Sequence, residues 1–220
     1  MRTITAAVQE IVRESEPVST ALRAGYLNMS AYAALIRTRV EEQTMKTVKA
    51  GSIVIALMRL RQEIITDSPL LPAVVIDDLS LKTGLLEIVF ERTEKNLGIL
   101  GKLPLRRPVF ADCFLVSQGI GEIAIIAHER AEKELKAAFG ETPRAVVRSL
   151  SSLTIRYSPI YIETPNTLYL ILQQFAGHRV NIVEILSTYT EVTLIVAEKD
   201  VDVSFHILNN LQRKDRTMAS

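Results

Sequence analysis

The sequence predicts an α+β protein in which an all-α N-terminal module precedes two copies of a mixed unit. Three observations predict this class. Apolar residues recur every 3.6 residues over the first 65 positions, which is the spacing of amphipathic helices. The segments after position 78 alternate between strand-like and helix-like patterns, and the pattern of Glu122–Ile126 recurs at Glu191–Ile195. The stretch Thr66–Pro72 contains two prolines, so residues 66–78 are predicted to be a linker.

The N-terminal module, residues 1–65, is predicted to contain four helices. Their expected spans are 3–14, Ser19–Ala24, Ala31–Gln43 and Val48–Glu63. Pro17 is expected to stop the first helix, Gly25 to end the second, and Asn28 or Ser30 to cap the third. In the third helix the expected inward residues are Tyr32, Leu35, Ile36 and Val40, and in the fourth they are Ile53, Leu57, Leu60 and Ile64.

The last two helices of this module resemble a helix-turn-helix. A short turn, Thr44–Thr47, joins them, and the segment 1–63 holds nine Lys and Arg against six Asp and Glu, a net charge of +3. The second helix of such a pair can reach phosphates and base edges in a DNA major groove. The predicted DNA-binding residues are Lys46, Lys49, Ser52 and Arg59. A dimerisation or purely structural helical module produces the same pattern, and Gly51–Met58 is very apolar for a helix that reads DNA, so both interpretations stay open.

The two copies are predicted as domains over 79–149 and 150–212, followed by a polar tail over 213–220. The first copy is expected to contain the segments Leu81–Arg92 (strand), Glu94–Leu103 (helix), Val109–Gln118 and Glu122–Ala127 (hairpin), Glu129–Phe139 (helix) and Arg144–Leu150 (strand). The second is expected to contain Leu150–Tyr157 (strand), Asn166–Gly177 (helix), Val180–Ser187 and Glu191–Ala197 (hairpin) and Val201–Leu211 (helix). The tail is too polar to supply a last strand. The order β-α-β-β-α-β is ferredoxin-like.

The segment Gly177–Val196 resembles the ACT regulatory domain, and more narrowly the paired ACT domains at the C-terminus of aspartate kinases. The shared features are a helix-ending Gly177, the pair Asn181-Ile182, a Ser/Thr-rich turn, and Glu191 at the start of the next strand. The resemblance covers about residues 150–210, is weaker over 79–149, and does not reach 1–63. Because no part of the chain resembles the kinase catalytic domain, the resemblance implies a regulatory protein and not an enzyme.

The resemblance also implies a ligand site. ACT domains pair side by side and bind a small molecule, usually an amino acid, near the loop between the first strand and the first helix. On this chain that loop is Glu163–Leu168, opposed by the strand that begins at Val180. The implied ligand-binding residues are Thr164, Asn166, Thr167, Val180, Asn181, Ile182, Thr188 and Thr190. A helix N-terminus favours a carboxylate, and an asparagine side chain offers both a donor and an acceptor. Asn166 stands where the family usually has glycine, and asparagine tolerates positive φ better than most residues.

Composition excludes several other classes of protein. Cys113 is the only cysteine, so an intrachain disulfide and a cysteine-based metal site are excluded. The three histidines have no metal-ligand spacing, and we find no paired carboxylates, nucleophile elbow or P-loop. We therefore expect no metal and no cofactor. The longest apolar runs, such as Ile53–Met58, are far shorter than the roughly 20 residues of a membrane span. With no signal-peptide core at the N-terminus, a cytoplasmic protein is expected.

The sequence thus predicts a cytoplasmic amino-acid-sensing regulator that forms a homodimer through its ACT-like domains. In the leading interpretation it is a ligand-responsive transcriptional regulator whose helical module binds DNA. The main alternative is an allosteric regulatory subunit of an amino-acid biosynthetic enzyme that does not bind DNA. A structural dimer without a working ligand site is a third interpretation.

Overall fold

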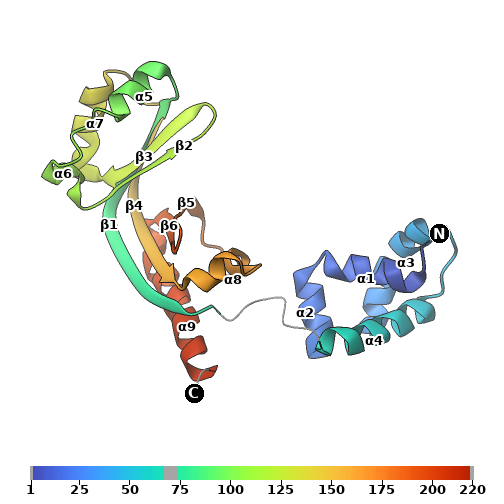
Figure 1. Cartoon of the computed structure of the whole chain (residues 1–220). Coiled ribbons are helices and arrows are strands. Elements are labelled where there is room, and N and C mark those ends of the chain that lie inside the picture. The colour runs from blue at the N-terminus through green and yellow to red at the C-terminus, as the bar shows by residue number, and fades with distance from the viewer. Residues whose placement is uncertain (1, 67–73, 219–220) are drawn as a thin grey trace. The chain divides into compact units, whose positions relative to one another are not determined.

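The computed structural model describes residues 2–66 and 74–218, with side chains described over 2–65 and 74–212. The chain divides into two compact units, Met1–Leu70 and Leu71–Ser220 (Figure 1). The first is all-helical and the second combines a sheet with helices, which agrees with the predicted α+β class. Each unit is described by itself below.

The helical unit contains all four expected helices. Their bounds are α1 Ile4–Arg13, α2 Glu16–Ala24, α3 Met29–Thr44 and α4 Ala50–Thr66. Pro17 lies in the first turn of α2, where a missing N–H costs nothing, so it helps to begin α2 and does not directly follow α1. Asn28 caps α3, since its side chain accepts a hydrogen bond of 3.0 Å from the Ala31 amide.

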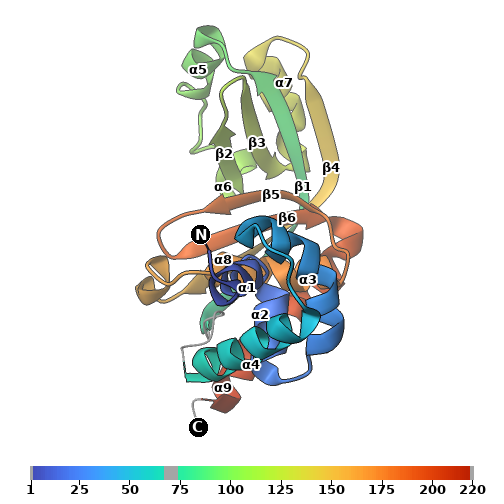
Figure 2. The same cartoon turned by 90° about the vertical axis from the view of Figure 1, so that its right-hand side faces the viewer.

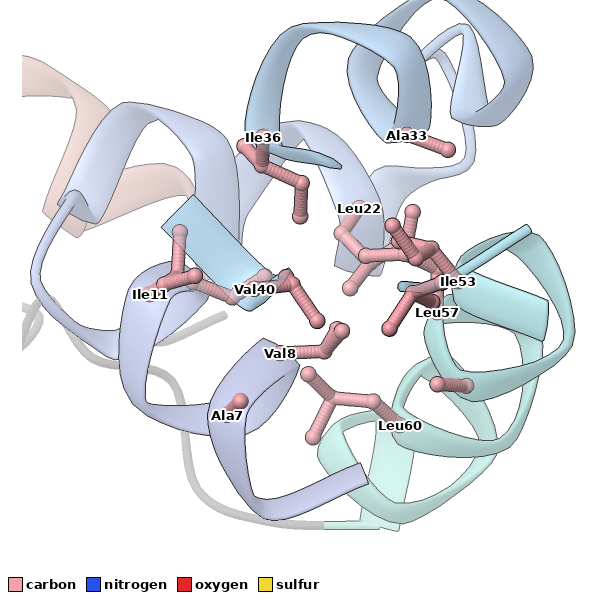
Figure 3. Close-up of a cluster of buried hydrophobic side chains, with 13 residues drawn as sticks. Ala7, Val8, Ile11, Leu22, Ala33, Ile36, Val40, Ile53, Leu57 and Leu60 are labelled. Carbon is pink, nitrogen blue, oxygen red and sulfur yellow. The ribbon is translucent and has the colours of Figure 1, made fainter. Parts of the chain in front are cut away.

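One apolar core holds these four helices together, and Figure 3 shows side chains from each of them directed toward it. The expected inward face of α4 is confirmed, because Ile53, Leu57 and Leu60 are buried and Ile64 packs against them. On α3 the expectation is wrong for Leu35, whose side chain is 77% exposed. Ala33 is buried in its place, so the inward stripe of α3 follows Ala33, Ile36, Val40 and Thr44.

The described strands of the second unit form one six-stranded sheet of order β2-β3-β1-β4-β6-β5, with every neighbouring pair antiparallel. Two long strands lie at its centre and pair from Ile76 opposite Tyr157 to Val89 opposite Ala145. The strand bounds are β1 Ile76–Glu91, β2 Phe114–Gln118, β3 Glu122–His128, β4 Ala145–Tyr157, β5 Ile182–Ser187 and β6 Glu191–Ala197.

Helices pack at both ends of the long strands. Figures 1 and 2 both place α5 and α7 at one end of this unit, and α8 and α9 at the other. The helix bounds are α5 Glu94–Leu100, α6 Pro108–Ala111, α7 Glu132–Phe139, α8 Thr167–Gly177 and α9 Val201–Met218. We call β2, β3, the adjoining parts of β1 and β4, and α5–α7 the first half, and the remainder of the unit the second half.

The two halves share their central strands. β1 begins at Ile76, inside the segment predicted as a linker, and its first part pairs with the last part of β4 beside β6 and β5. That part of β1 occupies the place of the closing strand that the second copy lacks. β4 runs without interruption through residues 149 and 150, where the boundary between two domains was expected. The two copies therefore lie in one compact unit with a continuous sheet.

Positive φ values mark the crossing points of both shared strands. Gly84 has φ +66° and Ser149 has φ +55°, and the register of β1 with β4 shifts on both sides of Leu85. Leu85, which follows Gly84, pairs with His128, the last residue of β3. Leu150, which follows Ser149, pairs with Ala197, the last residue of β6. The same kink thus occurs once in each shared strand, where the strand passes from one half to the other.

Each half buries one sheet face against its helices. In the first half the rings of Phe90 and Phe139 stack with centroids 3.9 Å apart. In the second half Phe175 of α8 and Leu208 of α9 pack against strand residues such as Leu194.

The opposite sheet face carries a shared cluster to which β2 and β5 both contribute. It is composed of Leu85, Cys113, Ile126, Leu150 and Ile195, with Leu115, Val183 and Leu186 packed against them. Cys113 is buried there, as expected of a small apolar residue.

Candidate functional site

The loop between β4 and α8 contributes lining residues to the candidate site. It begins with a 3₁₀ turn, Pro159–Ile162, and ends at Asn166, which adopts the left-handed conformation with φ +68°. Thr167 follows it and is 5% exposed, and its hydroxyl donates a hydrogen bond of 3.0 Å to the Thr164 carbonyl. The Thr164 hydroxyl in turn donates to the Ile160 carbonyl at 2.9 Å. These local bonds fix the path of the loop into α8.

The N-terminus of α8 differs from that of the corresponding helix in the first half. At α5 the Thr93 hydroxyl accepts a hydrogen bond of 3.1 Å from the Asn96 amide and so caps the helix. At α8 the first intrahelical bond is donated by the Leu170 amide to the Asn166 carbonyl. The amides of Thr167 and Leu168 precede that bond, at the end where the helix dipole is positive. This end of α8 therefore suits an anionic group.

A cavity of about 450 Å³ lies beside this helix end. The end of β4, the loop, the first turn of α8 and the turn between β5 and β6 all contribute to it. The lining residues are Tyr157, Tyr161, Ile162, Thr164, Asn166, Thr167, Leu168, Tyr169, Ser187, Thr188 and Tyr189. None of these described lining residues is charged, and four of the chain's six tyrosines are among them. The volume lies within the range of small-molecule sites.

The structure brings four of the expected ligand-binding residues to this cavity, namely Thr164, Asn166, Thr167 and Thr188. Thr190 lies next to it, where its carbonyl accepts a 3.0 Å hydrogen bond from the amide of Tyr157. Val180, Asn181 and Ile182 do not join the cavity within one chain. They stand at the start of β5, whereas the cavity meets the turn after its end, about 20 Å away at roughly 3.3 Å per residue. The implied site therefore divides into two groups of residues.

Sequence reasoning missed the four tyrosines of the cavity. Tyr157 and Tyr161 meet edge to face with their centroids 6.2 Å apart, and the Tyr161 hydroxyl accepts a 3.0 Å hydrogen bond from the Val75 amide. Tyr169 and Tyr189 are exposed at the rim. Four of the six tyrosines lie between positions 157 and 189, and this clustering is a sequence signal that could have identified the place.

A second cavity, of about 480 Å³, lies where β1 crosses between the halves. Its lining includes Lys82, Asp112, Cys113 and His128, and the Lys82 ammonium donates a hydrogen bond to the Asp112 carbonyl. Burial raises the pKa of the Cys113 thiol, which keeps it protonated and unreactive as a nucleophile.

Two glutamates meet on the face of the shared apolar cluster. Glu87 of β1 pairs with Ile126, and Glu184 of β5 pairs with Ile195, so both carboxyl groups lie on the side where those isoleucines are buried. Burial is the largest cause of a raised pKa of Glu87, which reaches about 7 when the charge of Glu184, a hydrogen bond to the Glu184 side chain and the charge of Glu122 are added to it. The hydrogen bond between the side chains of Glu87 and Glu184 joins β1 to β5 across the two halves.

The predicted DNA-binding residues Lys46, Lys49, Ser52 and Arg59 are all exposed. The two lysines lie in the loop between α3 and α4, which is held by a 2.9 Å hydrogen bond from the Val48 amide to the Glu41 carboxylate. Ser52 and Arg59 lie on α4 itself. That helix also exposes Ile55 and Met58, each by more than half of its side chain. Its outer surface is therefore mixed apolar and basic.

No group of three or more His, Cys, Asp or Glu residues within 2–65 and 74–212 is placed to hold a metal ion. Likewise, none of the helices in the described part of the chain is both long and apolar enough to cross a membrane.

Several solved structures that share the fold of this chain are those of aspartate kinases or of their regulatory subunits. The aspartate kinase of Clostridium acetobutylicum, described as an allosteric enzyme, aligns over 62% of this chain and 35% of its own with a TM-score of 0.52 and 14% identity. The regulatory subunits of aspartate kinase from Thermus flavus and Thermus thermophilus align over 62% of this chain and 98% and 97% of theirs, with TM-scores of 0.51 and 0.50 and identities of 12% and 13%. The chain thus spans about a third of the Clostridium enzyme and nearly all of the regulatory subunits. At these identities the likeness shows the fold.

No protein-family profile matches the sequence, and no curated protein matches it.

Proposed function

We propose that this chain is an amino-acid-sensing regulatory protein whose effector binds in the tyrosine-rich cavity at the N-terminus of α8. The observation that carries the proposal is the cavity itself, which combines a helix N-terminus with hydroxyl groups and no charged lining residue. The helix end accommodates the effector's carboxylate, and threonine hydroxyls accept from its ammonium group. The fold shared with regulatory domains of aspartate kinases supports the same role.

In this proposal each half of the second unit is an ACT-like domain, and two copies of the chain pair through these domains. Pairing explains the divided site, since Val180, Asn181 and Ile182 of a second copy then complete the cavity of the first. The protein acts as a regulator and carries out no catalysis of its own.

A thermal-shift screen of the twenty amino acids tests the effector site. One amino acid at about 100 times its dissociation constant stabilises the native state by about 2.7 kcal/mol, which raises the melting temperature. Asn166→Gly retains the shift because glycine adopts a φ of +68° freely, whereas Asn166→Val abolishes it because a β-branched residue is strained there. Absence of any shift with all twenty amino acids contradicts the proposal.

The helical unit transmits the signal, and two outputs are proposed for it. In the first, Lys46, Lys49, Ser52 and Arg59 contact DNA. In the second, the unit docks on an enzyme of amino-acid biosynthesis, which is favoured by the exposed apolar side chains of Ile55 and Met58 on α4.

A gel mobility assay at two salt concentrations separates these outputs. DNA binding strengthens at low salt, and the double variant Lys49→Glu with Arg59→Glu loses it, whereas Ile55→Ser with Met58→Ser keeps it. If the chain does not retard DNA even at low salt, the DNA output is excluded and the protein-docking output stands.

A further inference from the structure

We infer that the effector of the tyrosine-rich cavity is an aromatic amino acid and not one with a charged side chain. The inference rests on the proposed function, because it names the class of ligand for the same cavity. Its basis is the chemistry of the eleven lining residues, taken together with the size of the space they enclose.

None of the eleven described lining residues, nor Val180, Asn181 and Ile182 of a second copy, carries a charge that could pair with a charged side chain of the effector. Its polar atoms are the hydroxyl groups of Tyr, Thr and Ser, the Asn166 amide, and the backbone. The α-carboxylate and α-ammonium groups common to all amino acids find partners at the helix end and the hydroxyls. A further carboxylate, ammonium or guanidinium on the side chain loses water without meeting an opposite charge, which is costly. Glu163 is the nearest acidic residue in the loop sequence, but it is exposed and does not line the cavity.

The apolar surface of the lining suits a ring. Tyr157 and Tyr161 already meet edge to face, which leaves the faces and edges of neighbouring rings as partners for another aromatic group. Ile162, Leu168 and Tyr169 are each at least 40% exposed, so the lining presents apolar surface to water. A bound ring removes such surface from water. A cavity of about 450 Å³ accommodates one molecule of this size.

Lysine is the sharpest competitor, because the faces of tyrosine rings also attract cations. Without a lining carboxylate, however, a lysine ammonium gains only that attraction. We therefore expect the cavity to discriminate between phenylalanine and lysine, which are of similar length.

Tyr189 provides a direct test of the lining. Its ring is 72% exposed at the turn between β5 and β6, so Tyr189→Ala removes an aromatic contact without opening the core. Tyr26 is a matched control, since its ring is 70% exposed in the helical unit.

The experiment is isothermal titration calorimetry of the full chain with phenylalanine, tyrosine, tryptophan, leucine, lysine and aspartate. We expect an aromatic amino acid to bind at least about 10-fold more tightly than lysine and aspartate. Tyr189→Ala weakens that binding about 3- to 10-fold, and Tyr26→Ala leaves it unchanged. Tighter binding of lysine or aspartate overturns the inference while the sensing function stands. Tighter binding of leucine than of any aromatic amino acid overturns it too. If none of these six amino acids binds, the inference is overturned, and the proposed function fails as well when the thermal-shift screen of all twenty finds no ligand.

Discussion

Replacing Glu87 with glutamine tests whether the acidic pair between β1 and β5 makes the stability of the second unit depend on pH. Burial and the neighbouring Glu184 raise the pKa of Glu87 from 4.5 to about 7. Between these two values the folded state holds a proton that the unfolded chain has released. Because the folded state binds more protons in this window, the free energy of unfolding falls as pH rises from about 4.5 to about 7.

The magnitude follows from the size of that window. A difference of about 2.5 pKa units corresponds to about 3 kcal/mol at 1.36 kcal/mol per unit. Glu87 is only half-buried, so solvent screening reduces this to about 1–2 kcal/mol. In Glu87→Gln the amide carries no titrating proton, and its N–H can donate a hydrogen bond to the Glu184 side chain. The variant therefore loses the dependence between pH 5 and 8, and at pH 8 it is about 1 kcal/mol more stable than the wild type.

The single cysteine provides an assay that reports on the second unit alone. Cys113 is buried in the shared cluster, so a thiol reagent labels it only after this unit opens. Urea unfolding curves are prepared at pH 5, 6.5 and 8, and each sample is labelled in a brief pulse at one common pH. The exposed Glu198 gives the matched control, and Glu198→Gln is expected to follow the wild-type curve. An equal fall in stability for Glu87→Gln and the wild type between pH 5 and 8 would refute the reasoning.

Three further predictions concern the two units separately. Phe139→Ala removes the ring stacked on Phe90 and is expected to destabilise the second unit by about 3–5 kcal/mol in the same thiol-labelling assay, whereas Phe139→Leu costs less. Asn28→Ala removes the cap of α3 and is expected to cost about 1 kcal/mol in thermal unfolding followed by circular dichroism, while Asn28→Asp retains the cap and most of the stability. The pKa of Glu132 is held at about 2 by hydrogen bonds from Arg148 and Lys136, so its contribution is present above pH 4.5 and lost as pH falls toward 2. In Arg148→Ala nuclear magnetic resonance titration should find this pKa closer to its ordinary value, and an unchanged pKa would show that Arg148 is not its main partner.

The local elements were largely predictable because their signals are local. Helical periodicity and an Asn cap identify α3, and two β-branched runs around a short turn identify the hairpin of β5 and β6. The exception within α3 is Leu35, which is exposed while Ala33 is buried. Leu35 and Ala33 lie on two overlapping apolar faces of α3, and side-chain size alone does not show which face is buried. The packing of α1 and α4 against α3 decides it instead.

The pairing of the central strands was not predictable from the same signals. The second copy lacks a closing strand in sequence order, and Ile76, placed in the linker by the prolines before it, begins the strand that occupies this position. Strand pairing depends on partners that are distant in the sequence, such as Tyr157 opposite Ile76, and a pattern within one segment carries no information about them. The expected site combined residues from both ends of β5, namely Val180–Ile182 before it and Thr188 after it. The family resemblance indicates which residues contact a ligand, but it does not show that these two groups lie at opposite ends of one strand.

The shared strands connect the cavity to the whole sheet. Tyr157 lines the cavity at one end of β4, and the other end of this strand, at Ala145, pairs with Val89 in the first half. β1 crosses in the opposite direction, so neither half keeps its full sheet when the other unfolds. A ligand that binds only the native cavity therefore adds its binding free energy to the stability of the whole sheet. The shared cluster of Leu85, Leu150 and their neighbours extends this coupling to the opposite face, where both hairpins meet it.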